Sequence, residues 1–172
     1  RDLSHRPLGP RLRLLPVGSA EAMHRGRLAA DVARDEIELV HRHEEPVRRL
    51  AAWARERGII TVVDGAHPPG MLAVDLQSLG CDFYASSPHK WLLAPKGSGF
   101  LYISPEWIDR LWPLIASGGW DDLALKGDRF DHVGTRNDSL LVGFQAAVGF
   151  HNAIGTARVE RRCRGLATRL DS

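Results

Sequence analysis

The chain has 172 residues, of which 44% are hydrophobic and 26% are charged, and its formal net charge is +2. This composition is ordinary for a globular protein with a sizeable core, and the charge is too small to indicate nucleic-acid binding. No apolar run approaches a membrane span or a signal peptide, and two cysteines without metal-type spacing predict reduced thiols in a cytoplasmic protein.

The chain divides near Pro46. Residues 1–45 are rich in arginine and have no sustained hydrophobic period. We leave 1–45 unassigned, as an out-of-frame or disordered segment, and place one domain at 46–172.

The domain opens with a helix followed by a strand. Val47, Leu50, Ala51 and Ala54 fall on one helical face, and Gly58 suits the position just after the helix. Residues 59–63 are apolar and mostly β-branched, which is typical of a strand buried on both faces. Helix, glycine and buried strand together predict an α/β fold with a mostly parallel sheet and flanking helices.

Further elements follow in the same style. We expect a short helix over 74–79 ended by Gly80, strands over 81–85 and 100–103, and a helix from Ser104 that ends near Pro113. Residues 117–137 are expected to form a long loop, followed by helices over 139–153 and from Thr156. The apolar side of the 139–153 helix is predicted to comprise Leu140, Leu141, Phe144, Val148 and Phe150.

One of only three lysines lies where chemistry is expected. Lys90 follows the second strand and Asp64 follows the first, and strand ends of this kind line the ligand crevice of an open α/β sheet. A lysine amine can form a Schiff base with a cofactor aldehyde, and a carboxylate can hold a pyridine nitrogen protonated. The pair is therefore what a pyridoxal-phosphate (PLP) enzyme needs. Lys96 and Lys126 are interpreted as solvated surface charges.

Each residue also has a plainer interpretation. Asp64 alone could serve a turn, because Asp-Gly is a common turn pair, and His67 alone could be an ordinary loop histidine. Asp64, His67 and His89 could instead be metal ligands, but this leaves Lys90 unexplained. Trp91 is expected to pack rather than to contact a substrate.

Four segments, taken in order, resemble one family. They are Val-Asp-Gly-Ala-His at 63–67, Ser-Pro-His-Lys-Trp at 87–91, Gly-Ser-Gly-Phe-Leu-Tyr at 97–102 and Gly-Thr-Arg-Asn at 134–137. Their content and spacing resemble the class V aminotransferases, which are PLP enzymes of fold type I, and are most similar to the isopenicillin N epimerase-like branch. The resemblance implies part of the PLP-binding large domain, with the small C-terminal domain absent.

The resemblance also implies roles for individual residues. Lys90 would carry the Schiff base, Asp64 would pair with the pyridine nitrogen, and His67 would contact the phenolic oxygen. Ser87 and His89 would bind the phosphate. Thr135 would reach the phosphate of the neighbouring subunit's cofactor in a homodimer. No metal, nucleic-acid or membrane partner is implied.

The implied activity is that of an enzyme acting on an amino acid, of epimerase or aminotransferase type. One alternative is a catalytically inactive, truncated remnant. Another is a lyase similar to cysteine desulfurases or kynureninases, although neither Cys81 nor Cys163 lies where desulfurases carry their catalytic cysteine.

Overall fold

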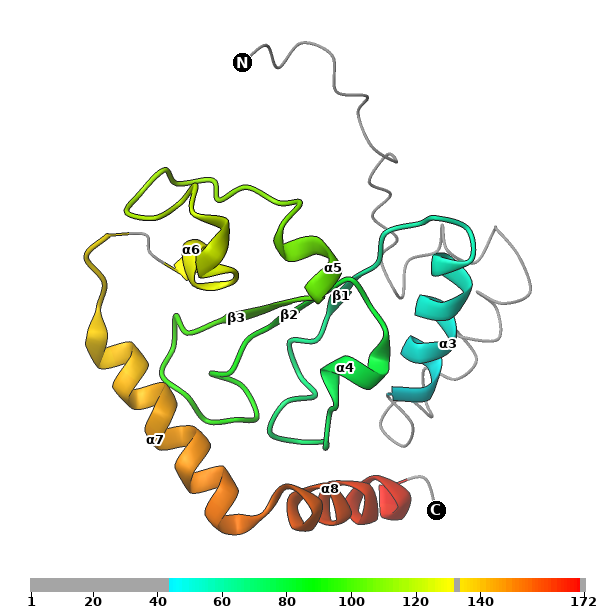
Figure 1. Cartoon of the computed structure of the whole chain (residues 1–172). Helices are drawn as coiled ribbons and strands as arrows, with labels where there is room; N and C mark the ends of the chain where they lie inside the picture. The colour runs from blue at the N-terminus through cyan, green and yellow to red at the C-terminus, as the bar shows by residue number, and fades with distance from the viewer. Residues whose placement is uncertain (1–43, 132–133, 171–172) are drawn as a thin grey trace.

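The computed structural model describes residues 44–131 and 134–170, and its centre is a three-stranded sheet (Figure 1). Strand β1 (Val62–Asp64) runs parallel to β2 (Phe83–Ser86), which pairs antiparallel with β3 (Phe100–Ile103). The α/β class is confirmed, but the sheet is mixed rather than mostly parallel. Residues 87–99 form turns instead of a crossover helix, so the chain returns antiparallel after β2.

Helix α3 (Glu44–Arg55) is confirmed, but it begins two residues before Pro46, where the sequence predicts its start. Glu44 and Glu45 lie in its first turn, where the helix dipole favours negative charge. Gly58 adopts a φ of +61° after the helix. The amides of Gly58 and Ile59 donate to the carbonyls of Arg55 and Ala54, at 3.1 and 2.9 Å. This is a Schellman motif, which glycine accommodates without strain.

Strand β1 is shorter and more exposed than predicted. Ile59 and Ile60 precede it, and Asp64 belongs to it rather than following it. Val62 is 42% exposed and Asp64 is also exposed, while Val63 is half-buried. The prediction of a strand buried on both faces is therefore wrong. The reason is that β1 is the edge strand of the described sheet and has β2 as its partner.

The core lies between α3, the sheet and a short helix. Helix α4 (Leu76–Leu79) is capped by Asp75, which accepts from the amides of Gln77 and Ser78 at 3.1 and 3.3 Å. Gly80, with a φ of +70°, ends it. The buried core residues are Ala51, Leu79, Cys81 and Tyr84.

The segment after β3 contains more regular structure than the predicted loop. Helix α5 (Pro105–Ile108) is shorter than expected, ending before Pro113. A 3-10 helix, η2 (Leu123–Leu125), and helix α6 (Asp128–Asp131) interrupt the predicted 117–137 loop. Lys126 pairs there with Asp109 at 2.8 Å.

Helices α7 (Asp138–Ile154) and α8 (Thr156–Leu170) close the described chain. Asn137 caps α7 by accepting from the Ser139 amide at 3.1 Å. The predicted apolar side of α7 is largely wrong, because Ala147 and His151 are its buried residues. Three members of the predicted side, Leu141, Val148 and Phe150, are exposed.

Two sequence predictions concern chain ends and membranes. The assignment of 1–45 falls outside the described part apart from Glu44 and Glu45, which begin α3. Within the described part, no helix is both long and apolar enough to cross a membrane.

Candidate functional site

The candidate site lies along one edge of the sheet. This edge is formed by the ends of β1 and β2 and the start of β3, and not by an outermost strand. Asp64 pairs with Ala85, and Ser86 pairs with Phe100, so these strand ends meet at one edge. Two loops leave this edge, residues 65–75 after β1 and residues 87–99 after β2. We call them the aspartate loop and the lysine loop. Parallel pairing of β1 and β2 is what brings Asp64 and Lys90 to the same side.

Lys90 and His67 meet across the two loops. The Lys90 Nζ lies 3.0 Å from the His67 Nε2. The other ring nitrogen of His67, Nδ1, accepts a hydrogen bond from the indole Nε1 of Trp91 at 3.2 Å. His67 therefore joins two consecutive residues of the lysine loop. Trp91 is 50% exposed, so its expected role in packing is at most partial.

Asp64 has an exposed carboxylate at the end of β1, on the same edge of the sheet. Its Oδ1 accepts a hydrogen bond from the Ala66 amide at 3.1 Å, which turns the chain after β1. Gly65 follows for a packing reason rather than a turn. A Cβ built on Gly65 would lie 1.8 Å from Cζ of the Tyr84 ring. The buried Tyr84 ring thus packs directly against Gly65 and leaves no space for a larger residue at that position.

The lysine loop is folded by its own backbone. The Lys90 amide donates to the Ser87 carbonyl at 3.1 Å, and the Ala94 amide donates to the Pro88 carbonyl at 3.1 Å. The His89 Nδ1 lies 3.3 Å from the carbonyl oxygen of Ser98, which can only accept. His89 Nδ1 is therefore the donor of that contact. Ser87 is half-buried and His89 is exposed.

Two buried hydroxyl groups at this edge have unused hydrogen-bonding capacity. Neither Tyr84 Oη nor Ser86 Oγ has a hydrogen-bond partner in the described part of the chain. The pKa of Tyr84 is raised mainly by burial, so its hydroxyl stays protonated and can donate a hydrogen bond. Buried polar groups are rarely left unpaired, and both lie next to the residues assigned to a cofactor.

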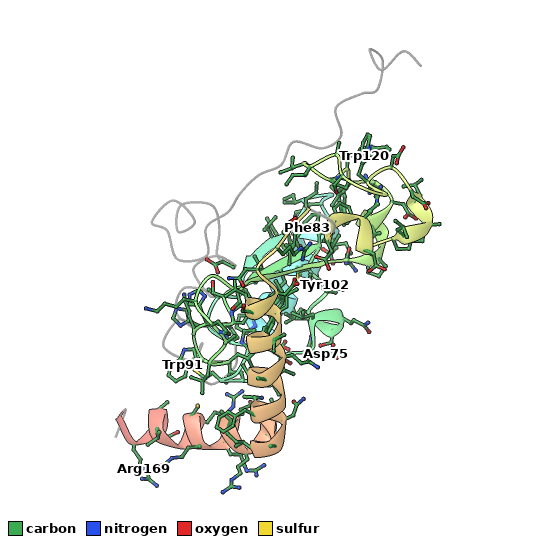
Figure 2. The ribbon with its side chains drawn as sticks, turned by 90° about the vertical axis from the view of Figure 1, so that its left-hand side faces the viewer. Asp75, Phe83, Trp91, Tyr102, Trp120 and Arg169 are labelled. Atoms are coloured by element: carbon green, nitrogen blue, oxygen red, sulfur yellow. The ribbon has the colours of Figure 1, made fainter. Side chains whose placement is uncertain are left out.

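Helix α7 braces both loops from outside. The Nε2 of the buried His151 lies 3.1 Å from the Gly70 carbonyl in the aspartate loop. Gly143 approaches Pro95 of the lysine loop so closely that a Cβ would lie 2.4 Å from its Cγ. The loops also touch each other, since a Cβ on Gly70 would lie 2.4 Å from the Leu92 amide nitrogen. Gly143 on α7 allows this close approach to the lysine loop. Figure 2 shows α7 rising from α8 toward the sheet, with Trp91 on the loop beside it.

The structure brings together some predicted site residues and leaves one apart. Thr135 is exposed in the segment before α7, after Gly134 with its φ of +95°. It lies beyond the two loops that carry the other residues. Among residues 44–131 and 134–170, no three histidine, cysteine or acidic side chains cluster as metal ligands would. Asp64, His67 and His89 therefore do not form such a cluster.

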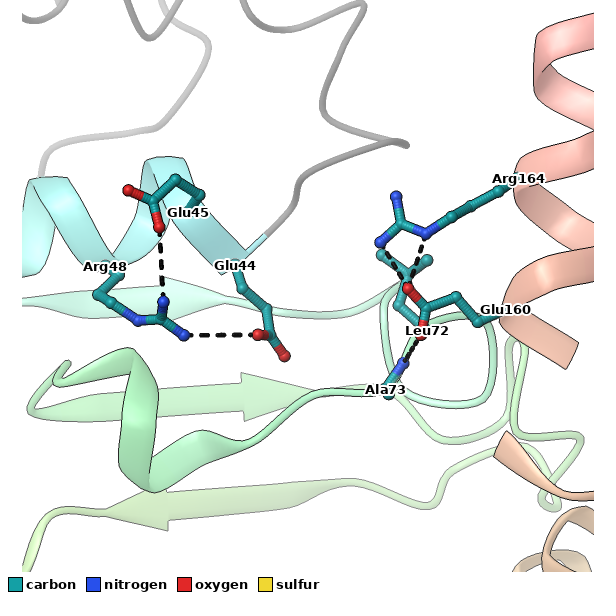
Figure 3. A pocket seen from close by; sticks show the side chains of 7 residues that line it. All are labelled: Glu44, Glu45, Arg48, Leu72, Ala73, Glu160 and Arg164. Carbon is teal, nitrogen blue, oxygen red and sulfur yellow. Dashed lines mark hydrogen bonds and ion pairs between the residues drawn. The ribbon is translucent and has the colours of Figure 1, made fainter. Parts of the chain in front are cut away.

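A cavity lies beside the far part of the aspartate loop, at residues 72–73. Its volume is about 380 Å³, and it lies between the start of α3, residues 72–73 and α8 (Figure 3). Glu160 of α8 accepts from the Ala73 amide at 3.0 Å and from Arg164 at 2.7 Å. Burial acts to raise the pKa of Glu160, but these hydrogen bonds lower it overall.

Sequence reasoning missed three contributors to this edge. Tyr84 was expected only as part of a strand, and His151 was not singled out. Trp91 was assigned to packing. A polar residue four positions after a small one on α7 could have indicated His151, since that spacing keeps Ala147 and His151 on one face. Nothing in the sequence indicates that the Trp91 indole turns back toward His67.

Known proteins resemble this chain in sequence over most of its length. The family described as aminotransferase class-V matches residues 32–172. Isopenicillin N epimerase from Streptomyces clavuligerus is 38% identical over 135 residues, covering 70% of this chain and 34% of the epimerase. A probable cysteine desulfurase from Pyrococcus abyssi (strain GE5 / Orsay) is 32% identical over 165 residues, covering 90% of this chain and 40% of the desulfurase.

A solved structure agrees with the fold. The apo structure of a cysteine desulfurase from Thermococcus onnurineus NA1 superposes with a TM-score of 0.63 and 34% identity, covering 72% of this chain and 32% of that one. The chain thus spans about a third of the length of the curated relatives it matches first. With the family match over most of its residues and α/β strand ends that carry the family's segments, the chain belongs to the class V aminotransferase family.

Proposed function

We propose that this chain supplies part of the PLP site of an enzyme that acts on an amino acid, with Lys90 as the residue that binds the cofactor covalently. The observation that carries the proposal is the 3.0 Å contact between Lys90 Nζ and His67 Nε2. It joins the two loops that contain most of the first two family segments, 63–67 and 87–91.

The residues fit the cofactor's chemistry. In PLP the aldehyde and the phenolic oxygen are on neighbouring ring carbons, and the pyridine nitrogen lies across the ring from the aldehyde. The residues proposed for the aldehyde and the phenolic oxygen, Lys90 and His67, are in contact. Asp64, proposed for the ring nitrogen, presents an exposed carboxylate at the same edge. The unpaired Ser86 hydroxyl offers a further polar group there.

When bound, PLP supplies an electron sink for bonds at the amino acid's Cα. Asp64 would hold the proton on the ring nitrogen, because a carboxylate favours the charged ring. Ser87 and His89 would bind the phosphate, and Thr135 would complete the site of a partner in a homodimer. The Lys90 amine, once free, would move a proton at Cα.

The reaction type we favour is that of an epimerase or aminotransferase. Returning the Cα proton to the opposite face inverts the amino acid, whereas transferring it to the cofactor begins transamination. The 38% identity to isopenicillin N epimerase supports this direction. Two free cysteines support a reducing, cytoplasmic setting.

A desulfurase-like lyase is the second candidate, and the similarity to the desulfurases of Pyrococcus and Thermococcus favours it. Such an enzyme would need a cysteine near Lys90. Cys81 is only 1% exposed and precedes β2, at the opposite edge from Lys90, and burial is the first cause that raises the pKa of its thiol. Cys163 lies in α8. Formation of alanine and sulfide from L-cysteine by PLP-loaded protein, in the presence of a thiol reductant that releases the sulfur as sulfide, would favour this candidate over the first.

Covalent trapping tests the cofactor proposal directly. Purified chain is incubated with PLP, reduced with borohydride and digested, and the peptides are weighed by mass spectrometry. We expect the pyridoxyl mass on Lys90, its loss in Lys90→Ala, and its retention in Lys96→Ala, a matched control in the same loop. No adduct on Lys90 in the folded chain would favour the inactive remnant.

A further inference from the structure

The histidine at the centre of the site has its two ring nitrogens in different contacts. Nδ1 of His67 faces the Trp91 indole N–H at 3.2 Å, and Nε2 faces the Lys90 Nζ at 3.0 Å. An indole N–H is a donor only, so the nitrogen it contacts must be an acceptor. In a neutral imidazole one nitrogen accepts and the other carries the proton. The Trp91 contact therefore leaves the proton for Nε2.

We propose that Trp91 is a positioning residue that fixes the His67 tautomer with its proton on Nε2, directed toward Lys90. The opposite tautomer would set two donors, the indole N–H and Nδ1–H, against each other at 3.2 Å. The doubly protonated ring would do the same. The Trp91 hydrogen bond thus favours one of the three protonation states of His67, in competition with a Lys90 ammonium, which would donate to Nε2 and favour the opposite tautomer.

The selected tautomer also decides what Lys90 can do. Nε2–H can donate to Lys90 Nζ if the amine is uncharged and offers its lone pair. An ammonium group has donors and no acceptor, so it would find no acceptor on His67 while Trp91 occupies Nδ1. Trp91 thereby matches His67 to the free-amine form of Lys90, which is the form that attacks an aldehyde. A proton on Nε2 is also what a phenolate oxygen would need from His67.

The link to PLP rests on the proposed function, but the tautomer does not. It is a property of three side chains in the chain without cofactor. It can therefore be measured before any ligand is added, and its failure is distinguishable from a failure of the cofactor proposal.

The test is nitrogen-15 NMR of the PLP-free chain labelled at histidine, with the His67 signals assigned from their loss in His67→Gln. At a pH where His67 is neutral, we expect Nε2–H to dominate. Trp91→Phe keeps an aromatic ring but removes the donor. The ratio of Nε2–H to Nδ1–H should then fall by roughly 2- to 12-fold, the range for one hydrogen bond.

The control is Trp112→Phe, because Trp112 is 55% exposed against 50% for Trp91 and lies outside both loops. It should leave the His67 ratio unchanged. Lys90→Ala should also keep Nε2–H dominant, since Trp91 remains. An unchanged ratio in Trp91→Phe, or an equal shift in Lys90→Ala, would overturn the inference.

A reciprocal measurement serves if Trp91→Phe does not fold. His67→Leu should shift the indole N–H resonance of Trp91 and leave that of Trp112 in place. If neither resonance moves, the hydrogen bond is absent and the inference is wrong. Borohydride trapping with PLP is run separately: trapping on Lys90 with an unselected tautomer would sink only this inference, and a selected tautomer without trapping would sink only the cofactor proposal.

Discussion

Two aspartates lie at opposite edges of the same small sheet and have very different surroundings. Asp82, just before β2, accepts hydrogen bonds from the Thr61 amide at 2.7 Å, the Thr61 hydroxyl at 2.8 Å and the Trp107 indole at 2.8 Å. Asp64, at the end of β1, accepts from the Ala66 amide at 3.1 Å and is exposed. The Asp82 carboxylate is thus hydrogen-bonded by several groups of the protein, whereas the Asp64 carboxylate faces outward with most of its acceptor capacity unused.

The difference separates an edge held by polar contacts from the edge proposed to bind the cofactor. Burial acts to raise the pKa of Asp82, but its hydrogen bonds from Thr61 and Trp107 outweigh burial and lower it. That edge is held by polar contacts. The edge with Asp64 has close packing of Tyr84 against Gly65 and of α7 against the loops, and it keeps the Tyr84 and Ser86 hydroxyls without a hydrogen-bond partner in the described part of the chain.

The largest effect should come from filling the space over Tyr84. Gly65→Ala places a methyl group where the ring already lies, 1.8 Å from Cζ. Ring or backbone must move, and overpacking of this kind costs about 3 kcal/mol. Urea unfolding would measure the loss. Gly127→Ala is the matched control, because nothing lies within 4 Å of the position that its methyl group would take, and it should change stability by less than about 0.5 kcal/mol.

A double-mutant cycle would test the stated cause. In a Tyr84→Leu background the ring is gone, so adding Gly65→Ala should cost much less than it does in the wild type. An equal cost in both backgrounds would show that Tyr84 is not what requires glycine there.

Replacing each aspartate by asparagine in turn tests whether Asp82 contributes more to stability than Asp64 does. Asp82→Asn removes the charge and turns an amide NH2 toward groups that donate. We expect a loss of about 2 kcal/mol, within the range for hydrogen bonds to charged groups. Asp64→Asn should change stability by less than about 0.5 kcal/mol. Urea unfolding at neutral pH measures both variants, and similar costs would remove the distinction between the edges.

The sequence predicted the parts of this comparison that depend on local patterns. Lys90 and Asp64 could be placed at one edge because strand ends in an α/β sheet share a side, and Gly58 could be placed after α3 because helix ends favour glycine. The antiparallel pairing of β3 with β2 could also have been predicted, because residues 87–99 have no helical pattern that could form a crossover helix. The prediction of a mostly parallel sheet overlooked this.

Other parts depend on contacts between distant segments. Asp82 looked like an ordinary strand residue, because its partners Thr61 and Trp107 are 21 and 25 positions away. The apolar side of α7 was only partly predicted, because the small Gly143 and the polar His151 meet the loops alongside Leu140, whose Cδ1 lies near Gly97. Hydrophobic periodicity alone does not indicate such a face.

The brace from α7 should have an intermediate effect. His151→Ala leaves the Gly70 carbonyl without its side-chain donor, at a cost of about 1.5 kcal/mol. It should also speed amide hydrogen exchange in residues 65–72 more than in α3. Asn152→Ala, the exposed next residue, is the control and should do neither. Faster exchange throughout the chain would indicate global destabilisation instead of a loosened aspartate loop.

The smallest effect should appear on acidification, and it tests whether the charge of Asp82 stabilises the fold. Because the folded-state pKa of Asp82 is lowered, the unfolded chain binds more protons as the pH falls through the ordinary value of 3.8, and the stabilisation from Asp82 is then lost. This stabilisation is complete above that pH. Asp82→Asn lacks the group, so the stability gap of about 2 kcal/mol between wild type and this variant at neutral pH should narrow near pH 3. Asp64→Asn is measured alongside as the control substitution. Some acid sensitivity should remain in Asp82→Asn, since the pKa of Glu160 is lowered as well. Urea unfolding at pH 7 and pH 3 for all three proteins measures the gap, and a constant gap would mean that the charge of Asp82 does not stabilise its edge of the sheet.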